Sequence, residues 1–483
     1  MTTQEGYKIM CDMGSLERKR ARWVAREASA LVGAAVAAAH AFAAEPQLFD
    51  SIRLEEPPPS WTEMVTCPDP KDDSFAVGIW GALEEYDWTD LVPFARADSP
   101  CSTGNETGGA AIDRDFLVGL LRIPSVTPDT ARVNEAVEYV RDYLERAGVF
   151  CVEEMGEDGA RRVLYASTRR EKTPDYLLLT HLDVVPGSPD QFKPRIEGDR
   201  IYARGAHDCK GNVAIAAQIL RNLNGSASVG VVFAADEETG GLTTSAMAKR
   251  GYVPRKLVLV LDAGTYGVFY AQKGSFNVCV QAVGRGGHSA CPWSCVNPIV
   301  KLTEGYRAFS AEWPMAPKDG WGDVVSPTVI SGGDAKNRIP DRAEMWLNLR
   351  FVNPDAPDRL VRLLKEHGGF EIAETRLVGK PMVSDREHPE IRRLLAMRAK
   401  CWPGKRARLE RMMAMTDACH YADCGVPVAI VGSLGENAHA DGEWGDMKNM
   451  DENLGMLSSF LVGEERAEGV KHEDASADAF RMR

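Results

Sequence analysis

Residues 176–183, YLLLTHLD, decide the fold. Their apolar start reads as a buried strand, and the strand runs directly into His181 and Asp183. The same arrangement recurs at 229–238, VGVVFAADEE, and at 256–262, KLVLVLD. Because the carboxyl ends of parallel strands meet at one edge of an open α/β sheet, we expect the polar side chains after these three runs to lie close together.

The segments around these strands alternate between helical and extended patterns. Residues 133–148, VNEAVEYVRDYLERAG, place apolar side chains at helical spacing and end at a glycine. Such alternation continues to about residue 271 and predicts an α/β domain with a mostly parallel sheet flanked by helices. From about residue 272 the pattern indicates four strands and two helices, which suit an inserted ferredoxin-like domain.

Composition and charge exclude several classes of partner. The 483 residues include 57 Lys and Arg against 70 Asp and Glu, so the formal net charge is −13. This balance argues against nucleic acid and anionic membranes as partners, since both select clustered cations. No apolar run approaches the roughly 20 residues of a membrane span. The 11 cysteines, an odd number without a C-x-x-C pair, favour a reducing compartment, and we expect a cytoplasmic protein.

Histidine and acidic residues gather at the strand ends and in one turn. Each has an ordinary interpretation by itself: Asp208 is a helix cap, Glu237 and Glu238 form a solvated turn, and Asp262 is a turn residue. Their combination is harder to explain, because adjacent acids repel one another unless a cation holds them together. Carboxylate and imidazole groups are ligands of divalent metals, so the sequence predicts a pair of metal ions.

The motifs resemble a known family. They are, in order, THLDVVPG, YARGAHDCKG, AADEETGG, LDAGTYG, GRGGHSACP, GGDAKNRIPD with LNLRF, TDACHYADCGVPVAIVGSLG and AHADGEW. Over roughly residues 112–463 the chain resembles the dinuclear zinc peptidase and deacylase family of acetylornithine deacetylase, succinyl-diaminopimelate desuccinylase, carboxypeptidase G and aminoacylase. The resemblance implies two Zn²⁺ ions, with Co²⁺ as a substitute, and a homodimer formed through the inserted domain, which we call the lid domain.

The resemblance also implies the roles of the metal-site residues. Five of them are expected to be metal ligands. His181 and Asp262 would bind one zinc ion, and Glu238 and His439 would bind the other. Asp208 would bridge the two ions. Asp183 is expected to orient the ring of His181. Glu237 is expected to be the general base that activates the attacking water and then protonates the leaving amine.

Three residues of the lid domain are implied to contact the substrate. His288 resembles the histidine that stabilises the tetrahedral oxyanion, often from the partner subunit. Asn337 and Arg350 resemble the pair that holds the substrate's free carboxylate. Without the resemblance, His288 and Asn337 would be interpreted as turn residues and Arg350 as a surface charge.

The predicted function is zinc-dependent hydrolysis of the amide bond of N-acyl amino acids, as in a deacetylase or desuccinylase. A metal-dependent dipeptidase or carboxypeptidase stays open as an alternative, because its substrates also carry a carboxylate and a scissile amide. A catalytically inactive binding protein is a third possibility. The complete set of metal ligands together with Glu237 argues against it.

The sequence divides into five predicted parts. They are an N-terminal extension of unknown role (1–110), the first part of the catalytic domain (111–271), the lid domain (272–380), the second part of the catalytic domain (381–463) and a flexible tail (464–483). Within the extension, 17–44 joins a basic segment to an Ala-rich one. A secretory signal would place the protein in the periplasm or outside the cell. We favour a helix, since alanine is the best helix former and charges interrupt the run.

Overall fold

The structure is a computed structural model that describes residues 111–313 and 320–463. The predictions for the N-terminal extension, including its Ala-rich segment, and for the C-terminal tail lie outside the described residues. Within the described ranges, no helix is long and apolar enough to cross a lipid bilayer.

The larger sheet has a parallel centre. Its four central strands run parallel as neighbours in the order β6 (Val229–Ala234), β3 (Tyr176–His181), β7 (Leu257–Leu261) and β17 (Val428–Val431). The flanking strands are β1 (Phe150–Met155) and β2 (Arg162–Ser167) on one side and β8 (Val268–Gln272), β15 (Met382–Val383) and β16 (Leu409–Met412) on the other. This architecture confirms the predicted fold class.

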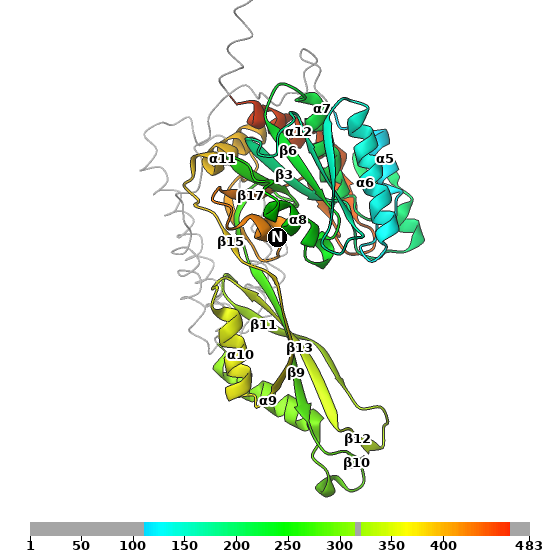
Figure 1. Ribbon diagram of the computed structural model, residues 1–483, viewed down its shortest axis with the longest axis vertical. Helices are drawn as coiled ribbons and strands as arrows, with labels where there is room; N and C mark the ends of the chain where they lie inside the picture. Colours follow the sequence, from blue (N-terminus) through cyan, green and yellow to red (C-terminus); the bar gives the residue numbers. More distant parts are fainter. Residues whose placement is uncertain (1–110, 314–319, 464–483) are drawn as a thin grey trace, which may run out of the picture. The chain divides into compact units, whose positions relative to one another are not determined.

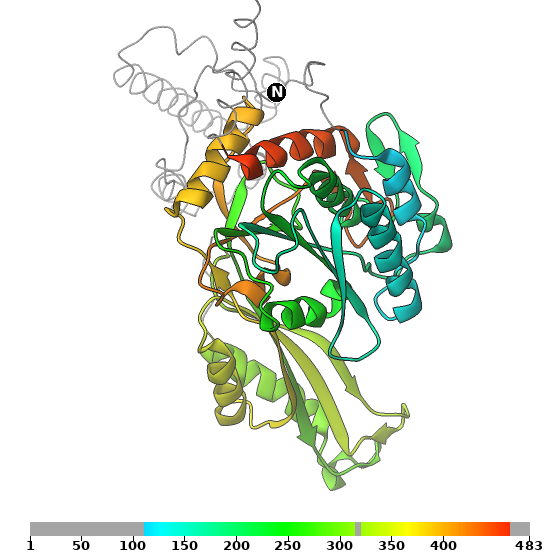
Figure 2. The ribbon, with the colours of Figure 1, turned by 45° about the horizontal axis from the view of Figure 1, so that its top comes forward.

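Helices cover both faces of this sheet (Figure 1 and Figure 2). One face packs against α5 (Arg114–Leu121), α6 (Thr130–Glu145), α7 (Lys210–Asn222), α11 (Pro389–Cys401) and α12 (Met447–Val462). The other face packs against α8 (Leu242–Lys249) and the 3₁₀ helix η6 (Asp417–Tyr421). The four central strands are therefore largely apolar on both faces. In β3, Leu178 joins the first core, whereas Leu177 and Leu179 join the second.

The lid domain has its own antiparallel sheet. Its elements follow the order β9 (Gly274–Val283), α9 (Pro298–Glu312), β11 (Val324–Gly332), β13 (Arg342–Phe351), α10 (Ala356–Glu366) and β14 (Glu371–Gly379). The strands are arranged as β11-β13-β9-β14, and α9 and α10 cover one face (Figure 1). This is the ferredoxin-like arrangement that the sequence predicts. The exact domain boundaries stay predictions.

Two smaller sheets hold the segments that carry His439 and His288. One contains β4 (Arg195–Glu197), β5 (Arg200–Tyr202), β18 (Gly435–Glu436) and β19 (Trp444–Asp446), and His439 lies in the loop from β18 to β19. The other pairs β10 (Gly287–His288) with β12 (Arg338–Ile339). His288 is thus held beside the segment that carries Asn337.

Candidate metal centre

Three neighbouring parallel strands deliver their polar ends to one edge of the sheet. His181 is the last residue of β3, and Asp262 directly follows β7. After β6 the chain forms the short 3₁₀ helix η4 (Glu237–Thr239), which contains Glu238. Because β3 pairs in parallel with both β6 and β7, these side chains converge as the sequence predicts.

Asp208 lies between two histidines. Its Oδ1 is 3.0 Å from Nε2 of His181, and its Oδ2 is 3.1 Å from Nε2 of His439. Nε2 of His181 is also 3.7 Å from Oδ1 of Asp262. Nε2 of His439 is 3.0 Å from Oε2 of Glu238. The five predicted ligands therefore form two groups that share the carboxylate of Asp208.

These groups fit a pair of divalent cations. Ligand atoms that lie about 2.0–2.2 Å from a tetrahedral zinc ion are roughly 3.3–3.6 Å from one another, close to the separations seen here. Oε1 of Glu238 is buried and has no hydrogen-bond partner among the described residues. An orphaned buried carboxylate oxygen is costly unless a cation faces it. The residues present could thus hold one ion on each side of Asp208.

The pKa values point to missing positive charge in the cluster. Burial raises the pKa of Glu237 well above its usual value, and the carboxylate of Asp262 raises it further. Burial also raises the pKa of Glu238. Hydrogen bonds to Asp208 and Glu238 raise the pKa of His439 to about 10. Metal ions held here would supply the positive charge that the cluster otherwise takes from protons on its histidines.

The backbone at His439 is left-handed, with φ of 62°. A residue other than glycine seldom adopts this conformation unless its surroundings impose it. Here it turns an imidazole on a loop toward Asp208 and Glu238, although 54% of the side chain is exposed. The neighbouring Asn437 has φ of 61°. The loop between β18 and β19 is thus shaped around the position of one side chain.

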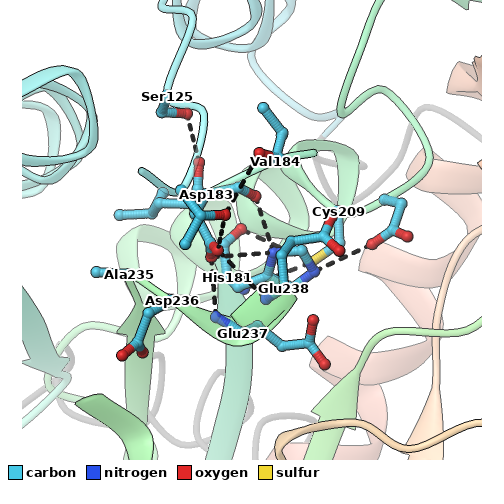
Figure 3. Close-up of polar contacts among 12 residues, drawn as sticks. Ser125, His181, Asp183, Val184, Cys209, Ala235, Asp236, Glu237 and Glu238 are labelled. Carbon is cyan, nitrogen blue, oxygen red and sulfur yellow. Dashed lines mark hydrogen bonds and ion pairs between the residues drawn. The ribbon is translucent and has the colours of Figure 1, made fainter. Parts of the chain in front are cut away.

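Asp183 connects the strand end of β3 to the turn at η4. It is fully buried, and its carboxylate accepts hydrogen bonds from Oγ1 of Thr127 (2.8 Å) and from the backbone nitrogens of Glu237 (3.1 Å) and Glu238 (3.3 Å). Its backbone oxygen lies 3.0 Å from Nδ1 of His181. In Figure 3, the backbone nitrogen of Glu237 faces Asp183, whereas the Glu237 side chain runs away from it. Asp183 thus positions His181 and the η4 turn together.

Glu443 lies behind the site, and the sequence reasoning assigned it no role. It is 2% exposed, and its carboxylate accepts hydrogen bonds from Nη1 of Arg204 (2.6 Å) and from the backbone nitrogens of Gly205, His207 and Asp208, each at 3.0 Å. One carboxylate therefore fixes the loop that carries the shared Asp208. The motif AHADGEW contains two acids, and only the structure shows that Glu443 is buried whereas Asp441 is exposed.

Asp417 is a second missed residue. It is buried behind the η4 turn, accepts a hydrogen bond of 2.5 Å from Oγ1 of Thr244, and has its pKa raised to about 8 mainly by burial. Its carboxylate also raises the pKa of Glu237. A Cβ atom on Gly241 (φ +64°) would lie 1.8 Å from Oδ1 of Asp417. Only glycine lets the chain pass this close at the end of the turn.

Cys209 lies against His181 but is no competing ligand. Its thiol is buried 2.9 Å from Oγ1 of Thr180, and it points toward the backbone oxygens of His181 and Leu261. Burial raises its pKa to about 11. A protonated thiol packed in this way acts as a small apolar filler.

The structure does not gather the predicted substrate contacts within one chain. Arg350 is half-buried near the end of β13 that faces the catalytic domain. Burial lowers the pKa of its guanidinium, and the nearby Glu237 raises it. His288 and Asn337 are exposed and adjacent, since the backbone nitrogen of Ser289 donates to the oxygen of Asn337 at 3.0 Å. They adjoin the other end of β13, which begins at Arg342. At the usual rise per residue, Arg342 lies roughly 26 Å along the strand from Arg350.

Comparisons with known proteins show the family of the chain. Residues 177–462 match the model of peptidase family M20/M25/M40. A succinyl-diaminopimelate desuccinylase of Rhodospirillum centenum is 29% identical over 295 residues, which cover 53% of this chain and 72% of that protein.

Two solved structures share the fold. An M20 family metallo-carboxypeptidase of Sulfolobus solfataricus has a TM-score of 0.62 at 19% identity, covering 72% of this chain and 99% of that one. A dinuclear metal-binding peptidase of the M20 family from Bacillus subtilis has a TM-score of 0.52 at 14% identity, covering 72% and 98%. With a family model that matches more than half of its length, the chain belongs to peptidase family M20/M25/M40 and is a metallohydrolase that acts on amide bonds.

Proposed function

We propose that this protein is a zinc-dependent deacylase that hydrolyses the amide bond of N-acyl amino acids. The observation that carries the proposal is the placement of Asp208, whose two carboxylate oxygens each face a different histidine. His181 and Asp262 would hold one ion, Glu238 and His439 the other, and Asp208 both. Co²⁺ is expected to replace Zn²⁺, since both accept the same nitrogen and oxygen ligands.

The chemistry is assigned to Glu237. Divalent cations held by these residues would polarise the scissile carbonyl and lower the pKa of water. Glu237 takes a proton from the attacking water as the oxygen bonds to the carbonyl carbon. It then gives that proton to the nitrogen as the C–N bond breaks. Its pKa, raised by burial, favours this role, because a carboxylate with an ordinary pKa would take the proton from water less readily.

The substrate's free carboxylate is assigned to Arg350. The guanidinium is held by the bond from its Nε to Oδ1 of Asn348 (3.1 Å), which leaves its other nitrogens for a ligand. A planar guanidinium can grip a carboxylate through two parallel hydrogen bonds. Its position near Glu237 places this grip beside the proposed base.

We also infer a homodimer formed through the lid domain. His288 and Asn337 lie too far along β13 to reach Arg350 of their own chain, so a partner subunit would have to supply them. The edge strand β11 supports such pairing, since Val329 and Ile330 are each 56% exposed and edge strands offer unpaired backbone groups. The cytoplasmic location stays a prediction from the sequence.

A substrate panel tests the proposal. Metal-loaded protein is assayed with N-acetyl and N-succinyl amino acids and with dipeptides. We expect the acylated amino acids to be cleaved with the higher kcat/KM, whereas a preference for dipeptides would establish the alternative dipeptidase or carboxypeptidase. In the same assay, Glu237→Gln should retain both metal ions and lose roughly 10²–10⁴ in kcat. Unchanged turnover in this variant would refute the assignment of the base.

A further inference from the structure

The lid sheet leaves one face open, opposite the face covered by α9 and α10. On it, Asn277 of β9 stands opposite both Asn348 of β13 and Arg376 of β14. Residues that oppose one another on neighbouring strands point to the same side of a sheet. Arg350 lies two residues beyond Asn348 and so shares this side. Two arginines therefore flank a pair of asparagines on one face.

This polar row is linked by hydrogen bonds. Nδ2 of Asn348 donates to Oδ1 of Asn277 at 2.7 Å and lies 3.2 Å from Oγ of Ser275, and Nε of Arg350 donates to Oδ1 of Asn348. The two amides are thereby oriented by each other and by Arg350. Such a fixed array is typical of a surface that positions a ligand, because side chains held in one rotamer lose little further entropy on binding.

Arg376 is directed at the catalytic turn. Its Nη2 donates to the backbone oxygen of Thr239 at 3.1 Å, and Thr239 belongs to the same 3₁₀ helix as Glu237 and Glu238. A guanidinium has five N–H donors, and this bond uses one. Among the described residues no carboxylate pairs with Arg376, and the residue is exposed. The remaining donors are available to a ligand beside the proposed base.

The charge around Arg376 is not uniformly positive. Glu374, two residues earlier on β14, stands opposite Cys279, which is two pairs along the sheet from Asn277. Glu371 stands opposite Gln281, farther still. Arg350 and Arg376 thus lie toward one end of the face, and Glu374 and Glu371 lie toward the other end.

We propose that Arg376 determines specificity by recognising a second carboxylate on the substrate, in addition to the one assigned to Arg350. The inference deepens the proposed function and rests on it for the position of the first carboxylate. The second carboxylate would come either from a dicarboxylic acyl group or from the side chain of an acidic amino acid. A guanidinium suits both, because it binds carboxylates bidentately.

Binding measurements separate this inference from turnover. Dissociation constants are measured for the metal-loaded Glu237→Gln protein with N-acetyl-L-alanine, which has one carboxylate, and with N-succinyl-L-alanine and N-acetyl-L-glutamate, which have two. The same constants are measured after adding Arg376→Gln, Arg376→Lys or Arg342→Gln. Arg342 is the matched control, since it lies exposed on the same face at the far end of β13.

We expect Arg376→Gln to weaken binding of one two-carboxylate probe by roughly 10- to 100-fold, as expected for a lost charged hydrogen bond. Binding of N-acetyl-L-alanine should change less than about twofold, Arg376→Lys should restore part of the loss, and Arg342→Gln should have no effect. The probe that loses affinity identifies the source of the second carboxylate. Equal weakening of all three probes, no weakening, or no binding of any probe would overturn the inference.

Wild-type turnover of N-acetyl-L-alanine tests the proposed function independently. A protein that shows the selective loss of binding but cleaves only dipeptides would keep Arg376 as an anion-binding residue and refute the deacylase. A protein that cleaves N-acetyl-L-alanine but shows no selective loss would keep the deacylase and refute the role of Arg376.

Discussion

The metal cluster and the substrate contacts of this protein are built in opposite ways. The five proposed ligands come from strand ends and loops spread over the sequence, yet their contacting atoms lie 3.0–3.7 Å apart. His288 and Asn337 are exposed on a small sheet at the far end of β13 from Arg350. One chain therefore brings the proposed metal ligands together but not the proposed substrate contacts, and the proposed substrate site would need a second subunit.

Replacing His288, one of the exposed proposed substrate contacts, should cause the largest loss of activity. We expect His288→Ala to lower kcat by roughly 10²–10³, the usual cost of removing one oxyanion donor, while the protein keeps both metal ions. Steady-state kinetics with metal analysis measures both. Ser289→Ala, at the neighbouring exposed position, is the matched control.

Complementation decides whether the histidine acts across subunits. Co-expressed His288→Ala and Glu237→Gln chains should recover about a quarter of the wild-type activity, because half of randomly formed dimers are mixed and each mixed dimer has one complete site of two. No recovery, together with a monomer in ultracentrifugation, would show that a single chain carries the whole site.

Replacing Glu443 tests whether the buried residues around the proposed metal ligands support metal binding. Glu443→Gln removes the charge that accepts from Arg204 and from three backbone nitrogens. We expect metal affinity to fall roughly 10- to 100-fold, as for other residues that orient ligands. Competition with a chelator measures this. Asp441→Asn, exposed in the same loop, should leave the affinity unchanged, and an equal loss in both variants would contradict the role of Glu443.

Replacing Arg350 should give the smallest change in the kinetic constants. Arg350→Lys keeps the charge but loses the planar fork, so we expect KM for N-acyl amino acids to rise about tenfold with kcat changed only a few-fold. Arg342→Lys on the same strand is the control. A loss confined to kcat would mean that Arg350 acts on the transition state rather than on the substrate's carboxylate.

The sequence predicts the metal cluster better than its surroundings for a physical reason. Apolar strands that end in His181 and Asp262 reveal both the sheet and the edge at which ligands meet. Pattern alone says nothing about which backbone groups a buried acid accepts, so the role of Glu443 is visible only in three dimensions. The register that places Arg376 opposite Asn277 depends on pairing between distant strands, which local periodicity does not determine.

The lid domain shows the same limit. Its four strands and two helices follow from alternation and helical spacing, and the structure confirms them. The distance between Asn337 and Arg350 does not follow, because the motifs that carry them are only a few residues apart in the sequence while β13 separates them in space. The motifs of Asn337 and Arg350 are close along the chain and were interpreted as parts of one site. Within one chain, the two residues lie near opposite ends of β13.

The most direct test of the account is the number of metal ions bound per chain. Purified protein saturated with Zn²⁺ and freed of excess should contain two ions per chain by elemental analysis, and Asp208→Ala should contain fewer than one, because both groups of ligands share its carboxylate. One ion or none in the wild-type protein, or two retained without Asp208, would contradict the shared centre on which the proposed chemistry depends.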